Sequence, residues 1–250
     1  MPASRTQASR LHTLAAAAAL FAALFAAPGP ASAQTRATLA TATPTTSALV
    51  TYQVVGLDTR KCAFPFCGGY YVKAVNQALT RCADGKWATR CHAVTLDTTG
   101  LGWTADQQAR FDEGFAKGQA LVIGTLATGT LQGVQANVLS AVSAWQGQTL
   151  KTAKGSFYSV RDTGIRCIAA PCPSLEASLL NTSKAPITTD LDLSTTGATD
   201  EQIAATGPAL ASSGVLVAGT IVPTTVSTVT GRTTKVNKLV ATEFYLPAKP

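Results

Sequence analysis

The feature that most constrains this chain is an internal repeat. The pair Cys62-x4-Cys67 is followed by Asn76, and the pair Cys167-x4-Cys172 is followed by Asn181 at the same spacing. All three landmarks recur at an offset of 105 residues, the difference between 62 and 167. Because a shared order of dissimilar landmarks is hard to obtain by chance, the sequence predicts two tandem copies of one unit of roughly 100 residues.

Two further landmarks extend the repeat. Leu121-Val-Ile-Gly-Thr125 recurs as Leu216-Val-Ala-Gly-Thr220 at an offset of 95, and Asn137-Val-Leu139 recurs as Asn237-Lys-Leu239 at an offset of 100. The landmarks place repeat unit 1 at residues 49–148 and repeat unit 2 at residues 155–247, joined by a polar and basic link at 149–154. Two small domains and one pseudo-symmetric body are both compatible with units of this size.

The N-terminus has the pattern of a secretory signal peptide. Arg5 and Arg10 precede an apolar run from Leu14 to Ala27, and a small-residue site, Ala31-Ser32-Ala33, follows it. An uncleaved membrane anchor is the alternative, but the run is shorter than the roughly 20 residues of a spanning helix. The sequence therefore predicts a signal peptide at residues 1–33 with cleavage after Ala33.

The remaining chain has the character of a soluble exported protein. Residues 34–48 are rich in Thr and Ala without apolar periodicity, which predicts a flexible leader. Loss of Arg5 and Arg10 leaves 18 basic residues (20 minus 2) against 13 acidic ones, a net charge of +5. This modest excess is unlike a nucleic-acid-binding protein, and no later apolar stretch predicts a transmembrane segment. We expect a secreted or periplasmic location.

The six cysteines all follow the signal peptide, and an even number in an oxidising compartment favours disulfides. Unless the two copies are cross-linked, the repeat predicts the bonds Cys62–Cys67 and Cys167–Cys172, which leaves Cys82 with Cys91. Residues 82–91 then form a disulfide-bounded insertion of ten residues, which matches the fall in offset from 105 to 95.

One observation conflicts with the third bond. A two-residue turn at Asp84-Gly85 places Cys82 opposite Trp87, not opposite Cys91. Either the loop is wider than a tight hairpin or the predicted pairing is wrong.

The repeated pattern predicts an α+β fold. Each copy has five short runs rich in β-branched and aromatic residues and one helix signal, typical of a small antiparallel sheet or partly closed barrel covered on one side. The predicted strands are 50–55, 69–75, 93–96, 120–126 and 136–145 in unit 1, and 157–160, 176–180, 187–193, 215–222 and 233–245 in unit 2.

The helix of each copy lies between its third and fourth strands. Thr104 and Thr199 each begin a capping box with Gln three residues later. Gly118 and Gly214 are the expected ends, and Pro208 should shorten or kink the second helix.

Residues suited to catalysis are few. His92 is the only histidine left after signal cleavage, and no Gly-x-Ser-x-Gly motif accompanies it. Asp97 and Asp192 are equivalent carboxylates that would suit a glycan hydrolase, but each follows a strand and precedes a turn, where Asp commonly bonds turn backbone. Asp106 and Glu201 fall in the first turns of the predicted helices, where negative charge is stabilising. We expect structural roles for these acids and no enzymatic activity.

No cofactor or metal site is predicted. The glycine patterns of nucleotide-binding loops are absent. A four-thiolate zinc site built from both Cys-x4-Cys pairs is conceivable, but export favours disulfides and structural zinc sites usually use Cys-x2-Cys spacing.

The insertion and its flanks are the first candidate contact surface. Arg and Trp supply large contacts, and a disulfide-bounded loop loses less entropy on binding. The alternative is a solvated loop whose indole folds back on the sheet. The candidate binding residues are Arg81, Lys86, Trp87, Arg90 and His92.

The Cys-x4-Cys loops are the second candidate surface. Ala63-Phe-Pro-Phe66 lies in the first loop and Ile168-Ala-Ala-Pro171 in the second, and proline restricts both. Such a loop suits a protease cleft, although it also suits a plain strand connection. Asn76 and Asn181 are interpreted as turn residues with positive φ.

The front half of each copy resembles a family of uncharacterised secreted bacterial proteins that carry a domain of unknown function. In unit 1 the resemblance rests on Arg60-Lys-Cys62-x-x-Pro65-x-Cys67-Gly-Gly-Tyr70 and Thr80-Arg-Cys82-Ala-Asp-Gly85, and in unit 2 on Gly164-Ile-Arg-Cys167-x-x-x-Pro171-Cys172-Pro-Ser174. It implies export and duplication, and it brings no activity, cofactor or catalytic residue.

These observations favour an exported, non-enzymatic binding or structural module with an unknown protein or glycan partner outside the cytoplasm. A protease inhibitor acting through a disulfide-bounded loop and a cell-wall or glycan hydrolase using Asp97 or Asp192 are the alternatives.

Overall fold

The computed structural model describes residues 48–169, 171–228 and 231–248. The predicted signal peptide and all of the leader except residue 48 lie outside these residues. Thr46–Pro250 form one compact unit. Below, residues 49–148 are called the first half and residues 155–247 the second half.

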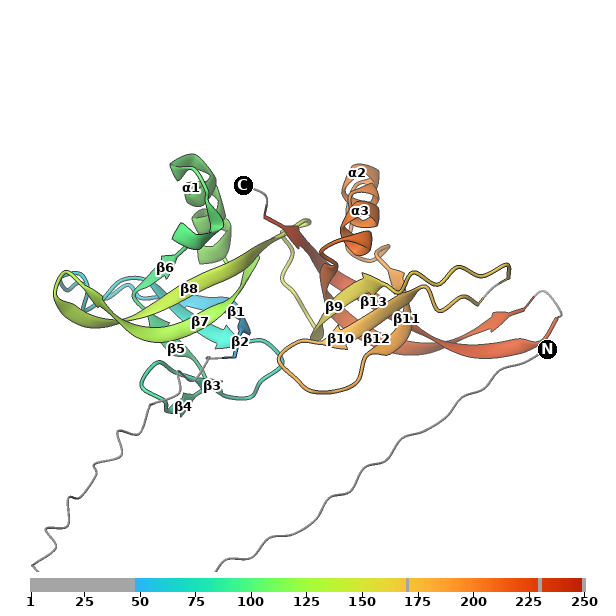
Figure 1. The fold of residues 1–250 in the computed structure, drawn as a ribbon, viewed down its shortest axis with the longest axis horizontal. Coiled ribbons are helices and arrows are strands. Elements are labelled where there is room, and N and C mark those ends of the chain that lie inside the picture. The colour runs from blue at the N-terminus through green and yellow to red at the C-terminus, as the bar shows by residue number, and fades with distance from the viewer. Residues whose placement is uncertain (1–47, 170, 229–230, 249–250) are drawn as a thin grey trace, which may run out of the picture. The chain divides into compact units, whose positions relative to one another are not determined.

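The fold is mostly β, with one large mixed sheet and a small two-stranded one (Figure 1). Eleven strands belong to the large sheet, in the order β11-β10-β9-β12-β13-β8-β7-β1-β2-β5, with β6 paired to β8. The small sheet holds β3 and β4. The strands of the first half are β1 (Val50–Leu57), β2 (Tyr70–Ala74), β3 (Thr80–Arg81), β4 (Trp87–Ala88), β5 (Cys91–Ala93), β6 (Thr95–Asp97), β7 (Ala120–Leu131) and β8 (Val134–Gly147). Those of the second half are β9 (Ser156–Asp162), β10 (Leu175–Leu179), β11 (Ile187–Asp192), β12 (Val215–Ser227) and β13 (Thr233–Pro247).

The structure differs from the predicted two copies of an antiparallel sheet or partly closed barrel, because one sheet runs through both halves. The end of β13 pairs with the end of β8, from Tyr245 opposite Gly147 to Pro247 opposite Trp145, and this pairing joins all eleven strands. Two copies of a sheet are therefore not evident as separate bodies. The sheet is also mixed, because β6 runs parallel to β8 and β11 runs parallel to β13.

Part of the sheet closes into a ring. In the second half, β11 pairs with both β10 and β13, so the path β11-β10-β9-β12-β13 returns to its start. In the first half, β5 pairs with β2 and β6 pairs with β8, while Val94 between them donates its N–H to the Asn137 carbonyl at 2.8 Å. In the first half, the β5–β6 segment thus joins β2 to the last strand, β8. In the second half, β11 likewise joins β10 to the last strand, β13.

The helical segments begin where the capping boxes predicted. Helix α1 (Ala105–Ala116) is capped by Thr104, and α2 (Asp200–Ala204) is capped by Thr199. The second segment is divided, because α3 (Thr206–Ala211) contains Pro208, which lacks the N–H that would bond back to Ala204. Figure 1 shows α1 and α2–α3 on the same side of the sheet. Within the described residues, no helix is long and apolar enough to cross a membrane.

The core has three parts. One lies under α1, where Phe111 and Phe115 pack on the first-half strands, and a second lies within the second-half ring around Phe244. The third joins side chains from both halves: Val75, Leu121 and Trp145 from the first half, and Phe157, Leu216, Ala218 and Tyr245 from the second. The two halves therefore share buried apolar surface.

Candidate functional site

The predicted insertion forms a small hairpin that is tied to the large sheet. Arg81 on β3 pairs with Trp87 on β4, and Cys82 donates its N–H to the Lys86 carbonyl at 2.7 Å. Cys82 thus lies opposite Lys86, and its sulfur bonds to Cys91 on β5. The predicted pairing was right because Cys91 reaches Cys82 from the next strand, not across the hairpin.

All three predicted disulfides are present: Cys62–Cys67, Cys82–Cys91 and Cys167–Cys172. Three disulfides are consistent with a protein that resides outside the cytoplasm.

The hairpin presents its large side chains to solvent. The Trp87 side chain is not folded back on the sheet, because the residue is 62% exposed. Its cross-strand partner Arg81 is also exposed, and Lys86 makes an exposed ion pair with Asp84 at 3.4 Å. The disulfide fixes the base of this hairpin, so an indole and a guanidinium lie side by side on a restrained loop.

Arg90 and His92 contact Tyr71 on β2. The Arg90 guanidinium lies over the Tyr71 ring, 4.4 Å from its centroid, and the His92 ring lies 5.5 Å from that centroid. Tyr71 and His92 are also opposite one another in the β2–β5 pairing. The structure therefore brings Arg90 and His92 together through Tyr71, a residue that sequence reasoning did not single out.

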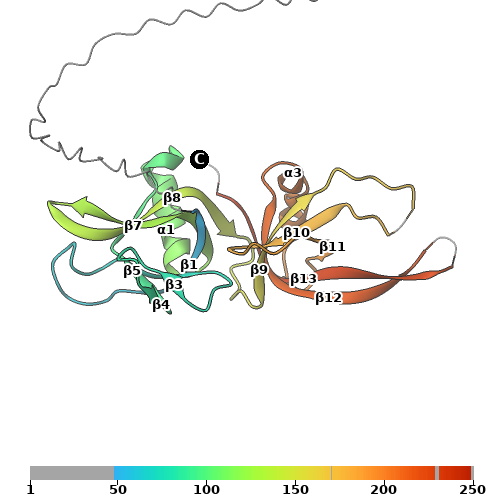
Figure 2. The same cartoon turned by 60° about the horizontal axis from the view of Figure 1, so that its bottom comes forward.

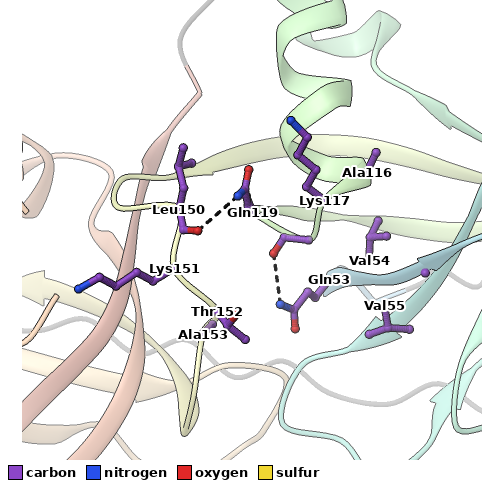
Figure 3. A pocket seen from close by; sticks show the side chains of 12 residues that line it. Gln53, Val54, Val55, Ala116, Lys117, Gln119, Leu150, Lys151, Thr152 and Ala153 are labelled. Carbon is purple, nitrogen blue, oxygen red and sulfur yellow. Dashed lines mark hydrogen bonds between the residues drawn. The ribbon is translucent and has the colours of Figure 1, made fainter. Parts of the chain in front are cut away.

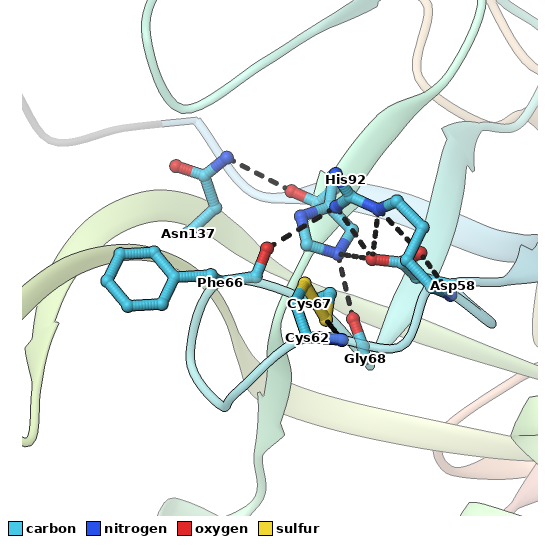
Figure 4. Close-up of polar contacts among 8 residues, drawn as sticks. Asp58, Cys62, Phe66, Cys67, Gly68, His92 and Asn137 are labelled. Atoms are coloured by element: carbon cyan, nitrogen blue, oxygen red, sulfur yellow. Dashed lines mark hydrogen bonds and ion pairs between the residues drawn. A yellow bond between two sulfur atoms is a disulfide. The ribbon is translucent and has the colours of Figure 1, made fainter.

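His92 is held by the buried carboxylate of Asp58 (Figure 4). Its Nε2 lies 2.8 Å from the Gly68 carbonyl and 3.2 Å from Asp58 Oδ2, and since both are acceptors this nitrogen carries a proton. Arg60 binds the same carboxylate through two nitrogens, at 2.9 Å to Oδ1 and 2.7 Å to Oδ2. These hydrogen bonds from Arg60 hold the pKa of Asp58 well below its usual range. The Asp58 side chain is 1% exposed, so the carboxylate that holds His92 is buried.

The Asp58–Arg60 pair also stabilises the Cys62–Cys67 loop, which follows β1. Arg60 also donates to the Phe66 carbonyl at 3.4 Å, and Phe64 and Phe66 are 49% and 63% exposed at the loop tip. An Asp–Arg pair of the same kind occurs in the second half. There Arg166 binds Asp162 at 2.9 and 2.6 Å, and hydrogen bonds from the guanidinium, with one from the Gly164 N–H, lower the pKa of Asp162 to about 2.

Sequence reasoning missed both Asp–Arg pairs, although a signal was present. Asp58-Thr59 recurs as Asp162-Thr163 at an offset of 104 residues, close to that of the cysteines.

Asp97 and Asp192 serve turns. Asp97 Oδ1 accepts from the Thr99 N–H at 3.1 Å and the Thr99 hydroxyl at 2.7 Å, and Asp192 Oδ1 accepts from the Ser194 N–H at 3.0 Å and the Ser194 hydroxyl at 2.6 Å. These bonds lower the pKa of both carboxyls, whereas a general acid needs a raised pKa. Within the described residues, no cluster of His, Cys, Asp and Glu could hold a metal ion.

Asn76 and Asn181 have the predicted positive φ, 59° and 57°, and a second role that the sequence did not reveal. Asn76 Nδ2 donates to the carbonyls of Phe157 and Leu180 at 2.7 and 3.0 Å, and its Oδ1 accepts from the Phe157 N–H at 2.8 Å. Asn181 makes the reciprocal bonds, donating to the carbonyls of Thr51 and Val75 at 2.8 and 2.9 Å and accepting from the Thr51 N–H at 2.8 Å. Each half thus satisfies backbone groups of the other.

The link between the halves borders a cavity of about 380 Å³ (Figure 3). Gln119 Nε2 donates to the Leu150 carbonyl at 3.3 Å across it, and Gln53 Nε2 donates to the Gly118 carbonyl at 3.4 Å. The link is anchored by Glu243, which is 1% exposed and accepts from the N–H groups of Thr149 and Lys151 at 3.1 and 2.9 Å. This arrangement explains the course of the link.

Comparison with known proteins gives one match. The family model described as Domain of unknown function (DUF6748) matches residues 51–250. Neither a curated protein nor a solved structure matches the chain.

Proposed function

We propose that this chain, which belongs to the DUF6748 family, is an exported, non-enzymatic binding module. Its contact surface would be the basic–aromatic surface, defined here as Arg60, Tyr71, Arg81, Lys86, Trp87, Arg90 and His92. The sequence pattern of residues 1–33 and the three disulfides support a place of action that is secreted or periplasmic.

The observation that carries the proposal is the exposed indole of Trp87 beside Arg81 on a disulfide-anchored hairpin. An indole that is 62% exposed leaves apolar surface in water, and the β3–β4 hairpin that carries it has strands of only two residues each. Trp and Arg are the residue types that most often dominate binding energy at interfaces. Because the Cys82–Cys91 bond already restrains the hairpin, binding there costs less conformational entropy.

The charge of this region favours an acidic partner. Residues 58–92 contain six basic residues and two acidic ones, a net charge of +4 (six minus two) out of the +5 expected after signal cleavage. Both acids are paired, Asp58 with Arg60 and Asp84 with Lys86. An acidic protein surface or an anionic glycan would therefore be attracted to it, more strongly at low salt.

We also infer that the two halves descend from one duplicated unit. Support comes from the shared order of elements: two antiparallel strands, a third strand parallel to the fifth, a Thr-capped helix and a long hairpin. Such a five-stranded, partly closed barrel with one helix resembles the OB fold. This likeness concerns the fold alone and brings no ligand with it.

A binding comparison with a matched control tests the function. Partners are captured from the exterior fraction of the native cell with the wild-type protein, and the affinity of the recovered partner is then measured for variants. We expect the double variant Trp87→Ala with Arg90→Ala to bind at least about tenfold more weakly, a loss of about 1.4 kcal/mol. The control, Ile168→Ala with Lys184→Ala, removes an exposed apolar and a basic side chain from the second half and should bind normally. Equal affinity of the double variant and the wild type would remove this surface from consideration.

A protease inhibitor is the second candidate, favoured by the Cys62–Cys67 loop. Phe64 and Phe66 are exposed at its tip. The Asp58–Arg60 pair and the Cys62–Cys67 disulfide restrain the loop. Stoichiometric inhibition of a secreted protease that prefers aromatic residues, lost in Phe66→Ala, would support this role. A broad protease panel without inhibition would contradict it.

A further inference from the structure

A cavity in the second half lies beside an incompletely paired strand. It has a volume of about 480 Å³ and is bordered by the Cys167–Cys172 loop, by the start of β11 and by the arms of the β12–β13 hairpin. Figure 2 shows that this hairpin extends well beyond β9 and β10. The walls are Pro171–Ser174, Thr188–Asp190 and Lys235–Asn237, with Val226. None of these residues belongs to the basic–aromatic surface.

The first arm of β13 has an open backbone edge in this cavity. The parallel pairing with β11 covers only Lys238–Val240 of β13, whereas residues 233–237 pair with β12 alone within the described part of the chain. Pro223 stands opposite Asn237, and because proline has no N–H, that pair cannot exchange two hydrogen bonds. Asn237 and its alternate neighbours Lys235 and Thr233 therefore direct their backbone groups away from β12. Lys235 and Asn237 both border the cavity.

The opposite wall is held in place before any ligand arrives. Thr163 donates its N–H to the Ser174 carbonyl at 2.9 Å and its hydroxyl to the Pro173 carbonyl at 2.8 Å. The Asp162–Arg166 pair and the Cys167–Cys172 bond restrain the same loop. At the closed end of the cavity, Asn237 Nδ2 donates to the Thr188 carbonyl at 3.2 Å. This bond lies where the pairing of β11 with β13 begins. A preformed cavity of this kind lowers the entropic cost of binding.

The chemistry of the walls selects the class of ligand. The described lining residues include hydroxyl groups, one amide, one acid (Asp190) and one base (Lys235), but no aromatic side chain on which a sugar or a base would stack. Acid and base balance, so the cavity does not favour a strongly charged ligand. An open strand edge is complementary to another extended backbone, which donates and accepts at the same spacing. We propose that this cavity binds a short, extended peptide segment of a partner protein, which pairs with the Lys235 backbone as an added strand.

Peptide selection provides the probe for this site. A displayed library of random heptapeptides is panned against the full chain without its signal peptide, and binding of the enriched peptides is measured by fluorescence anisotropy. We expect Lys235→Ala, which keeps the backbone N–H, to bind the peptides like the wild type. Lys235→Pro removes that N–H and should weaken binding at least tenfold, while circular dichroism checks that it remains folded, since proline is tolerated at an open edge.

Two further comparisons keep the inference independent of the folding of any variant and of the function proposed above. Two versions of an enriched peptide, each N-methylated at one of the two alternating sets of residues, lose the N–H donors along one edge or along the other, and the version methylated on the edge that faces β13 should lose binding to the wild type. Trp87→Ala should bind the peptides normally. The inference would be overturned if no peptide were enriched, or if both N-methylated versions bound like the parent peptide. It would also be overturned if folded Lys235→Pro bound the peptides like the wild type, or if Trp87→Ala lost binding.

Discussion

Single asparagines connect the two halves of this molecule. Asn76 and Asn181 stand 105 positions apart in the sequence (181 minus 76), and each bonds to the backbone of the first strand in the opposite half. Their positive φ places the side chains beyond the ends of their own strands, where they reach the neighbouring half. A residue type suited to turns thereby becomes a connector, because its amide both donates and accepts.

Removing one of these amides should destabilise the whole chain. We predict that Asn76→Gly lowers the free energy of unfolding by about 1–3 kcal/mol, because it leaves the backbone groups of Phe157 and Leu180 without their partner. Glycine tolerates the positive φ of 59°, so the loss reports the hydrogen bonds and not backbone strain. Urea unfolding followed by circular dichroism measures it. An unchanged urea midpoint would contradict this prediction, because it would show that water replaces the hydrogen bonds of Asn76 without loss of stability.

The sequence predicts the local backbone conformation of these residues but not the groups that they contact. Asn at a strand end indicates a turn, whereas its partner 81 residues away depends on how the halves meet. Likewise, His92 was predicted as a candidate binding residue, and only the structure pairs it with Asp58, which lies 34 positions earlier (92 minus 58). Charge pairs between distant segments leave no periodic pattern in a sequence.

At the scale of elements, the strands and helices could be predicted because their signals are local. The strand runs, the capping boxes at Thr104 and Thr199 and the break near Pro208 all correspond to elements of the structure. The hairpin arms are longer than predicted. β12 continues to Ser227 and β7 to Leu131, through Thr-rich and Gly-containing sequence whose strand pairing comes from the facing arm.

The recurring glycines in these hairpins have a steric cause. Gly124 and Gly219 lie at the register shifts of β7–β8 and β12–β13, and a Cβ there would meet the Ser140 carbonyl oxygen at 2.0 Å and the Val240 carbonyl oxygen at 2.3 Å. Bulges bring two backbones too close for a side chain. This contact explains the glycine of the Leu-Val-x-Gly pattern in both halves.

A pair of glycine substitutions tests this explanation. We predict that Gly219→Ala lowers the free energy of unfolding by about 1–3 kcal/mol or more, because backbone must move to admit the methyl group. The matched control is Gly207→Ala in helix α3, where the methyl group meets nothing within 4 Å and alanine is the better helix former. Thermal unfolding should show a lower Tm for the first and an equal or higher Tm for the second. Equal Tm values for both variants would contradict the proposed role of Gly219.

At the scale of the whole molecule, the repeat was compatible with two small domains or with one pseudo-symmetric body, and the structure has one continuous sheet. The decisive feature is the pairing of Tyr245–Pro247 with Trp145–Gly147, which extends β13 past its predicted end. Sequence periodicity cannot reveal that the last strands of two similar units pair with one another, because each strand has the same local pattern whether its edge is free or paired. The buried Glu243, which anchors the link, was missed for the same reason.

A shared core predicts a single unfolding transition. Trp145, Phe157 and Tyr245 belong to one buried cluster contributed by both halves, so neither half can lose its structure without exposing the surface of the other. All three tryptophans, Trp87, Trp103 and Trp145, lie in the first half, so indole fluorescence reports that half, while far-UV circular dichroism reports both. We predict that the two signals give coincident urea transitions in the wild type.

Substitution within the shared core should move both signals together. Tyr245 is 1% exposed, and Tyr245→Ala should lower the free energy of unfolding by about 3–5 kcal/mol, as expected for removal of a buried aromatic ring. Indole fluorescence and far-UV circular dichroism should report the same decrease. Val222→Ala, at a side chain 36% exposed on the β12 arm, is the control and should change it by about 0.5 kcal/mol or less. If circular dichroism instead showed a second transition without a fluorescence change, the halves would unfold independently, and the reciprocal bonds of Asn76 and Asn181 would not couple them.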